Sequence, residues 1–274
     1  MKKSKNLVSI VAALMALTVV CSSSGIVLAG ADSTEEKRYY DVPPIATAEV
    51  NQETVSYTSV EQTIVRLTGG MPIYYTRTLT NACGPVAGSI VVGYYDKYIE
   101  SLVPNYSTAY ASGKFRGMDS THIPALMQSL YTEMRTNVDD VGVSESDCLN
   151  GLRTYVEGKG SSLSYTSLKG TSFNETGCIN ALNALEPMLF FCNSVALYEV
   201  FVTENNTSIT QVIQSQNHIM VISGYAKLEY YNGTDNFRTD IFLEVRTGWY
   251  TGSSGHVKLE NASWIDSAYR VSIY

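Results

Sequence analysis

Apolar residues recur at helical spacing in four segments of the chain, and this pattern predicts four helices. The predicted helices cover residues 86–98, 123–134, 148–156 and 178–185. Pro85 stands where a first-turn proline belongs, so the first helix is expected to begin beside Cys83. Ser144 or Ser146 is the expected N-cap of the third helix.

Residues that alternate in polarity, or that are β-branched and aromatic, predict strands in the later part of the chain. The predicted strands cover residues 161–168, 188–192, 196–202, 219–228, 239–246, 255–259 and 269–274. The pair Asn232-Gly233 indicates a hairpin turn. Because helices come first and antiparallel strands follow, the expected class is α+β, with a helical half packed on a curved antiparallel sheet.

The N-terminal part divides into two segments. Residues 1–31 combine a basic start, an apolar run and small residues near Ala29, which is typical of a secretory signal that is removed. A retained membrane anchor and lipidation at Cys21 are the alternatives. Residues 32–70 are polar and predict a spacer or short pro-segment, which leaves residues 71–274 as one domain.

The charge balance limits the possible partners. The formal net charge is −7, and loss of Lys2, Lys3 and Lys5 with the signal would make it −7 − 3 = −10. An acidic exported chain is a poor ligand for nucleic acid, and we expect no stable membrane contact after signal removal. The sequence has no phosphate-binding or dinucleotide motif, so no cofactor is expected.

The four cysteines after residue 31 are widely spaced and lack the C-x-x-C pattern of zinc sites, so no metal is expected either. Export permits disulfides. If Cys83 is reserved for chemistry, then Cys148, Cys178 and Cys192 can form one disulfide at most, and the sequence does not indicate which.

Cys83 and His218 are the candidate catalytic pair. A helix N-terminus stabilises a thiolate, which is the reactive form of cysteine. His218 precedes an apolar strand that ends at Gly224-Tyr225, and an imidazole there could accept the thiol proton. His256, which also precedes a short strand, is the second choice of base, and His122 is interpreted as a residue of a helix cap.

Three motifs resemble those of the C39-like branch of papain-like bacterial cysteine peptidases. Residues 81–87 resemble the N-x-C-G-P-[AV]-[AS] opening, residues 218–225 resemble the H-x-x-x-x-x-G-Y strand, and residues 243–249 are similar to a third motif that ends in Trp. The resemblance implies a papain-like fold with its cleft between the helix of Cys83 and the sheet of His218. It also implies hydrolysis of peptide or protein substrates.

Two positions depart from the family pattern. Where the family has an Asn or Asp that orients the imidazole, this chain has Arg246 or, with a one-residue shift, Thr247, and Glu244 on the same strand face is a candidate substitute. Arg77 stands where the family often carries a Gln, so it is either a second oxyanion donor beside the Cys83 backbone N–H or a surface charge. A catalytically impaired papain-fold surface-binding protein and a cell-wall amidase are therefore the alternative functions.

Overall fold

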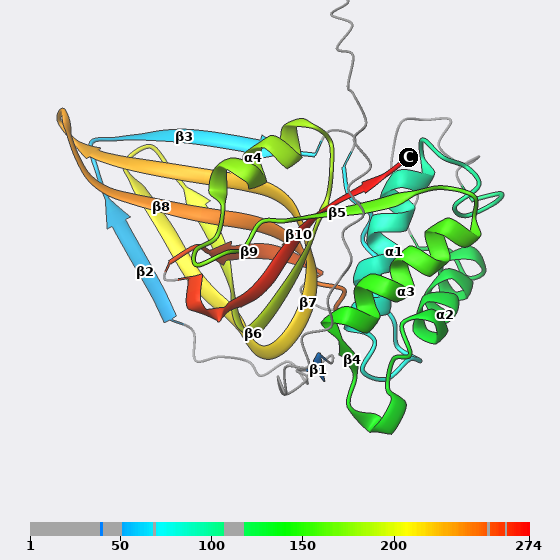
Figure 1. The fold of residues 1–274 in the computed structure, drawn as a ribbon. Helices are drawn as coiled ribbons and strands as arrows, with labels where there is room; N and C mark the ends of the chain where they lie inside the picture. The colour runs from blue at the N-terminus through cyan, green and yellow to red at the C-terminus, as the bar shows by residue number, and fades with distance from the viewer. Residues whose placement is uncertain (1–38, 41–50, 68–69, 107–117, 251–252, 261) are drawn as a thin grey trace, which may run out of the picture. The chain divides into compact units, whose positions relative to one another are not determined.

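The computed structural model describes residues 39–40, 51–67, 70–106, 118–250, 253–260 and 262–274 (Figure 1). These residues belong to one structural unit, Lys37–Tyr274. The signal segment expected at residues 1–31 lies outside the described residues. In the described part of the chain, no helix has both the length and the apolar character needed to cross a membrane.

All four predicted helices are confirmed, and two of them begin at a side-chain N-cap. The helices are α1 (Cys83–Asp96), α2 (His122–Glu133), α3 (Glu145–Gly158) and α4 (Glu175–Asn183), with short 3-10 turns at Val138–Asp140 and Ala262–Trp264. Ser144 caps α3 as predicted, since its hydroxyl accepts the Asp147 N–H at 3.1 Å. Asn174 caps α4 in the same way through the Gly177 N–H at 2.8 Å. These polar caps lie outside the apolar period, so α3 and α4 begin earlier than the pattern predicted.

Within the described ranges, ten strands form two sheets. A small one pairs β1 (Tyr39–Tyr40) with β4 (Val143–Ser144). The large antiparallel sheet contains β2 (Asn51–Ser56), β3 (Ser59–Arg66), β5 (Leu163–Ser167), β6 (Met188–Val202), β7 (Asn206–Asn232), β8 (Asp235–Arg246), β9 (Ser254–Lys258) and β10 (Ile265–Ile273). Its order is β2-β7-β8-β9-β6-β10-β5, and β7 also pairs with β3 and β6. The predicted hairpin at Asn232-Gly233 joins β7 to β8.

Two long strands, β6 and β7, form the centre of the sheet. They pair from Met188 opposite Ile222 to Val202 opposite Thr207. The sequence pattern predicts two short strands here, with a break at residues 193–195 because Asn193 and Ser194 are polar. The strand continues there because the Asn193 amide donates to Asp266 of β10 at 2.8 Å, so a neighbouring strand satisfies the polar side chain.

The predicted fold class, a papain-like α+β layout with a helical lobe on an antiparallel sheet, is wrong. Strands make up 44% of the described residues and helices 26%, and one eight-stranded sheet dominates the four helices. Residues 51–66, interpreted as a spacer, contribute β2 and β3, both of which pair with β7. Their side chains are mostly exposed, so no apolar period marks them, which is common for edge strands.

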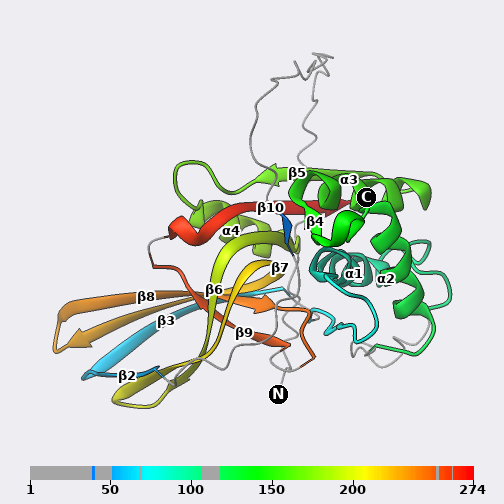
Figure 2. The ribbon, with the colours of Figure 1, turned by 90° about the horizontal axis from the view of Figure 1, so that it is seen from below.

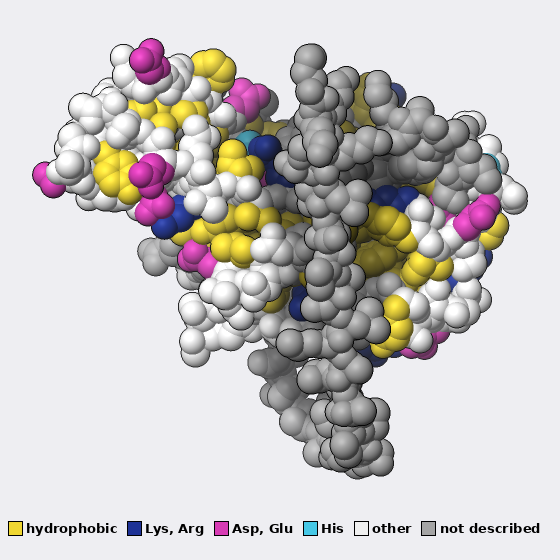
Figure 3. Space-filling view, turned by 90° about the horizontal axis from the view of Figure 1, so that it is seen from above, with side chains coloured by type: hydrophobic (Ala, Val, Ile, Leu, Met, Phe, Trp, Pro, Cys, Tyr) yellow, Lys and Arg dark blue, Asp and Glu magenta, His cyan; other side chains and the backbone are white. Residues whose placement is uncertain are grey.

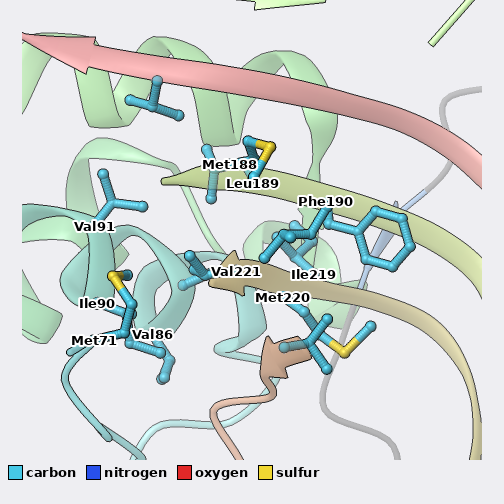
Figure 4. Packing of buried hydrophobic residues seen from close by; sticks show 14 of the residues in the cluster. Met71, Val86, Ile90, Val91, Met188, Leu189, Phe190, Ile219, Met220 and Val221 are labelled. Carbon is cyan, nitrogen blue, oxygen red and sulfur yellow. The ribbon is translucent and has the colours of Figure 1, made fainter. Parts of the chain in front are cut away.

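The helices α1, α2 and α3 lie together at one end of the sheet, while α4 lies apart from them near β3 (Figures 1 and 2). Every residue of α1 is buried. Ile90 and Val91 of α1 face Val221 of β7 and Leu189 of β6 across the main core (Figure 4). Each such buried aliphatic side chain contributes about 1.5–3 kcal/mol, so this packing fixes α1 against the sheet.

A second, smaller core lies in the sheet itself. It is formed by Val55, Tyr57, Ile209, Leu228, Tyr230 and Phe242. On the face seen from above, hydrophobic side chains also reach the described surface, between scattered acidic and basic ones (Figure 3). Over the whole described surface, the large exposed hydrophobic residues include Ile64, Ile73, Phe201, Phe237 and Tyr250.

Candidate active site

Cys83 is the first residue of α1, as the sequence predicted, and its side chain is 1% exposed. The helix begins with a hydrogen bond from the Val86 N–H to the Ala82 carbonyl at 2.9 Å. Just before it, Asn81 has a left-handed backbone with φ 52°, a conformation that asparagine tolerates better than most residues. The Asn81 amide donates to Asn137 Oδ1 at 2.6 Å, which holds the approach to the cysteine in place.

The first turn of α1 packs directly on the strand that carries His218. A Cβ added to Gly84 would lie 3.5 Å from Ile219, the residue after His218, and only 2.7 Å from Val143. Val86, two residues further on, lies against Gly248 in the loop that follows β8. These contacts bring the helix end bearing Cys83 against both segments that surround His218.

His218 is a fully buried residue of β7, opposite Cys192 of β6. Before it, exposed and buried residues alternate along β7. At Asn217 the backbone is left-handed, with φ 46°, and His218 is buried where the alternation ends. The Cys192 thiol donates to the His218 carbonyl at 3.1 Å, which secures the backbone at this irregular point.

The imidazole ring of His218 is held by the segment after β8. Its Nε2 lies 2.7 Å from the Thr247 carbonyl oxygen, and its ring stacks on Trp249 with centroids 4.6 Å apart and an interplanar angle of 23°. Because a carbonyl only accepts, Nε2 carries the proton and Nδ1 is left as the basic nitrogen. The Thr247 hydroxyl accepts the backbone N–H of Trp249 at 3.1 Å. The two residues that hold the imidazole ring are therefore also hydrogen-bonded to each other.

The remaining cysteines have the character of buried thiols. No disulfide joins any of Cys83, Cys148, Cys178 and Cys192, the cysteines of the described residues. Burial raises the pKa of Cys178 to about 12. Burial also raises the pKa values of Cys148 and Cys192, with a smaller contribution from the nearby Cys83 thiol. At neutral pH these three side chains therefore stay protonated and are weak nucleophiles.

Glu244 and Arg246, the sequence candidates for orienting the imidazole, contact each other and a third residue. Glu244 accepts from Arg66 at 2.5 Å and lies 3.5 Å from Arg246. Burial lowers the pKa of Arg246, against the opposing charge of Glu244. Glu244 pairs with Gly224 of β7. Measured along the strand at a rise of ~3.3 Å per residue, Gly224 lies about 20 Å from His218.

The acceptor that does contact His218, the Thr247 carbonyl, belongs to the main chain. Thr247 stood in the sequence only as a shifted alternative for a side-chain role. A backbone carbonyl is present at every residue, so no sequence signal could have singled this one out.

Of the other two candidate side chains, Arg77 stacks on Tyr250 and His256 lies within the sheet. The Arg77 guanidinium is exposed and lies 3.5 Å above the ring of Tyr250. His256 of β9 pairs with Tyr198 and Glu244 in the sheet, and burial lowers its pKa. A histidine that stays neutral within the sheet fits packing better than proton transfer beside α1.

His122 begins α2, and its interpretation as a residue of the helix cap is confirmed. Asp119 accepts the backbone N–H groups of His122 and Ile123 at 2.8 and 3.0 Å. The carboxylate also lies 2.5 Å from the His122 ring nitrogen Nδ1. These bonds satisfy the first amides of α2.

Comparison with models of protein families, with curated proteins and with solved structures finds no match to this chain. Within the described ranges, no group of three or more His, Cys, Asp or Glu side chains is arranged to hold a metal ion. The function proposed below therefore rests on the geometry around Cys83 and His218.

Proposed function

We propose that this protein is a cysteine peptidase in which Cys83 is the nucleophile and His218 the general base. One observation carries the proposal: the buried His218 ring is held by Thr247 and Trp249, and the next residue, Ile219, packs on the helix turn that begins with Cys83. A nucleophile, a base and a group that orients the base are the three parts that covalent catalysis by cysteine needs.

In the proposed reaction, His218 Nδ1 removes the proton from Cys83 Sγ, and the thiolate attacks the carbonyl carbon of a peptide bond. The backbone N–H of Cys83 donates to the developing oxyanion. The imidazolium then protonates the departing amine as the C–N bond breaks, which leaves a thioester on Cys83. Water, deprotonated by Nδ1, hydrolyses the thioester and releases the acid with a restored thiol.

The neighbours of His218 support this cycle electrostatically. The Thr247 carbonyl is the negative end of a dipole, so it stabilises the imidazolium formed when the thiol loses its proton. Trp249 is 2% exposed and covers one face of the ring, which keeps water from the hydrogen bond between Nε2 and Thr247. A hydrogen bond is stronger in such a low-dielectric setting.

The proposed substrate is a peptide or protein outside the cell. The expected signal at residues 1–31 supports export of the chain to the surface or the medium. Mass spectrometry of the protein recovered from culture medium, with a mature N-terminus near Asp32, is the measurement that checks export. Full-length protein that stays with membranes would contradict it.

The direct test is hydrolysis of a fluorogenic peptide library by the full chain. Cys83→Ala and His218→Gln should each lower the rate by about a thousandfold or more. Cys178→Ala removes another buried cysteine, within α4, and is the matched control that should retain activity. Hydrolysis by Cys83→Ala at the rate of the unaltered protein would overturn the assignment.

Alkylation provides a second test that does not depend on finding a substrate. Iodoacetamide at a pH of about 6 should label Cys83 faster than Cys148, Cys178 and Cys192, and His218→Gln should slow that labelling. Peptide mass mapping locates the label. Labelling of Cys83 no faster than a model thiol would instead favour the catalytically impaired binding protein.

A further inference from the structure

A cavity of about 540 Å³ lies next to the segment that holds His218. Tyr250, which lines it, directly follows Trp249, the residue stacked on the imidazole. Residues 75–79, a few positions before Cys83, line the cavity beside Tyr250, and one side of α2 completes the lining. The cavity is thus bordered by the two segments of chain that lead into the candidate site.

The cavity combines an apolar lining with one charge. Its apolar side chains are Leu79, Met118, Pro124 and Met127, and Tyr75 and Tyr250 pack edge to face beside them with ring centroids 4.9 Å apart. Arg77 is the one charged residue among the described lining residues. Pockets of this size typically hold a ligand side chain in apolar surroundings and orient it through a few polar groups.

Arg77 is positioned to bind an anion. It does not take part in the ion pairs that the described residues form. Its guanidinium stacks 3.5 Å from the centre of the Tyr250 ring. A stacked guanidinium keeps its N–H groups in its own plane, where they match the geometry of a carboxylate.

We propose that this cavity selects peptides in which a bulky apolar side chain lies next to a carboxylate, with the apolar group in the cavity and the carboxylate on Arg77. The inference rests on the proposed function in taking the ligand to be a peptide. The carboxylate can come from an acidic side chain or from the C-terminus of the peptide. Both present the same chemistry to Arg77, so the experiment separates them.

Binding is measured by fluorescence anisotropy with the full-length Cys83→Ala protein and labelled peptides. One pair of peptides exchanges leucine for alanine, a second exchanges the neighbouring aspartate for asparagine, and a third exchanges a free C-terminus for an amide. The leucine pair should differ by about tenfold or more in Kd. One of the two carboxylate pairs should also differ by about tenfold, as expected for a charge-assisted hydrogen bond.

Four variants assign these preferences to residues. Arg77→Gln should abolish the discrimination between carboxylate and amide while keeping that between leucine and alanine. Arg153→Gln, which removes an arginine held over Tyr165 of β5, is the matched control and should change neither. Gln128→Trp should narrow the cavity and weaken binding of the leucine peptide. Ser129→Trp, on the same helix but outside the cavity lining, should not.

The outcomes separate this inference from the proposed peptidase. Binding that depends on Arg77 and Gln128, without hydrolysis by the unaltered protein, would sustain the cavity's role and contradict the peptidase. If the Arg77 and Gln128 substitutions leave hydrolysis or binding unchanged, the role of the cavity is overturned and the peptidase assignment is not. Failure of every library peptide to bind Cys83→Ala would overturn it as well.

Discussion

The Nε2 atom of His218 lies 2.7 Å from the backbone carbonyl oxygen of Thr247. This contact assigns the task of orienting the imidazole to the main chain. No substitution of a side chain can delete the acceptor itself. The site should therefore respond most strongly to changes that move the loop after β8.

Gly248 fixes the position of that loop. Its φ is +76°, and a Cβ there would lie 2.7 Å from Val86 of α1. Gly248→Ala should therefore push the Thr247 carbonyl away from His218 and lower kcat by about a hundredfold, the scale of an ångström-sized misplacement. Steady-state kinetics with a peptide substrate provides the measurement.

Gly233 is the control for backbone strain in that experiment. Its φ is +66°, but no atom lies within 4 Å of an added Cβ. Gly233→Ala should cost about 1–2 kcal/mol of stability from left-handed strain alone and should leave kcat unchanged. Equal kinetic losses in the two variants would show that the loop after β8 has no special role.

Glu244 should prove dispensable for turnover, because its carboxylate contacts Arg66 and Arg246. Glu244→Gln should keep kcat within about twofold, and it should lower the free energy of unfolding by less than about 1 kcal/mol because the Arg66 side chain is 55% exposed. Turnover and urea denaturation are measured on the same preparation. A tenfold fall in kcat without loss of stability would return the orienting role to Glu244.

Trp249 should matter through its ring face and not through its indole N–H. The Trp249 Nε1 atom has no hydrogen-bond partner among the described residues, whereas its ring stacks on His218. Trp249→Phe keeps an aromatic face and should retain most of kcat, while Trp249→Leu loses the stack and should lower kcat by about tenfold. Similar kinetic losses in both variants would contradict a role for stacking.

The buried tyrosines predict a loss of stability at alkaline pH. Burial raises the pKa of Tyr155 and Tyr225 from 10.0 to about 12. The folded chain thus keeps these protons when the unfolded chain loses them, so stability is complete below a pH of about 10 and falls as pH rises from 10 towards 12. Urea denaturation across this range, followed with tyrosinate absorbance, tests the sign.

Tyr155→Phe is the companion variant. The Tyr155 hydroxyl donates to the Leu102 carbonyl at 2.8 Å, so its removal should lower stability at neutral pH by about 1 kcal/mol. The same variant should show a shallower fall of stability above pH 10, because one shifted group is gone. An unchanged slope would contradict the assignment of the shift to Tyr155.

The sequence by itself determined the helices and the place of Cys83. Local signals sufficed for these features: apolar residues at helical spacing, Pro85 in the first turn, and Ser144 as a cap. The hairpin at Asn232-Gly233 was equally local, because two residues define the turn. Each of these predictions concerns residues close together in the chain.

Only the tertiary structure decided the class of the fold and the partner of His218. The strands β2 and β3 have mostly exposed side chains and exist because their backbones pair with β7, a long-range interaction that leaves no period in the sequence. The sequence offered Glu244 as a candidate beside Arg246 and Thr247, because an acidic side chain is visible there. In the structure, His218 Nε2 instead contacts the backbone carbonyl of Thr247. A backbone acceptor is identical at every residue, so only the packing of α1, β7 and the loop after β8 determines which carbonyl lies beside the imidazole.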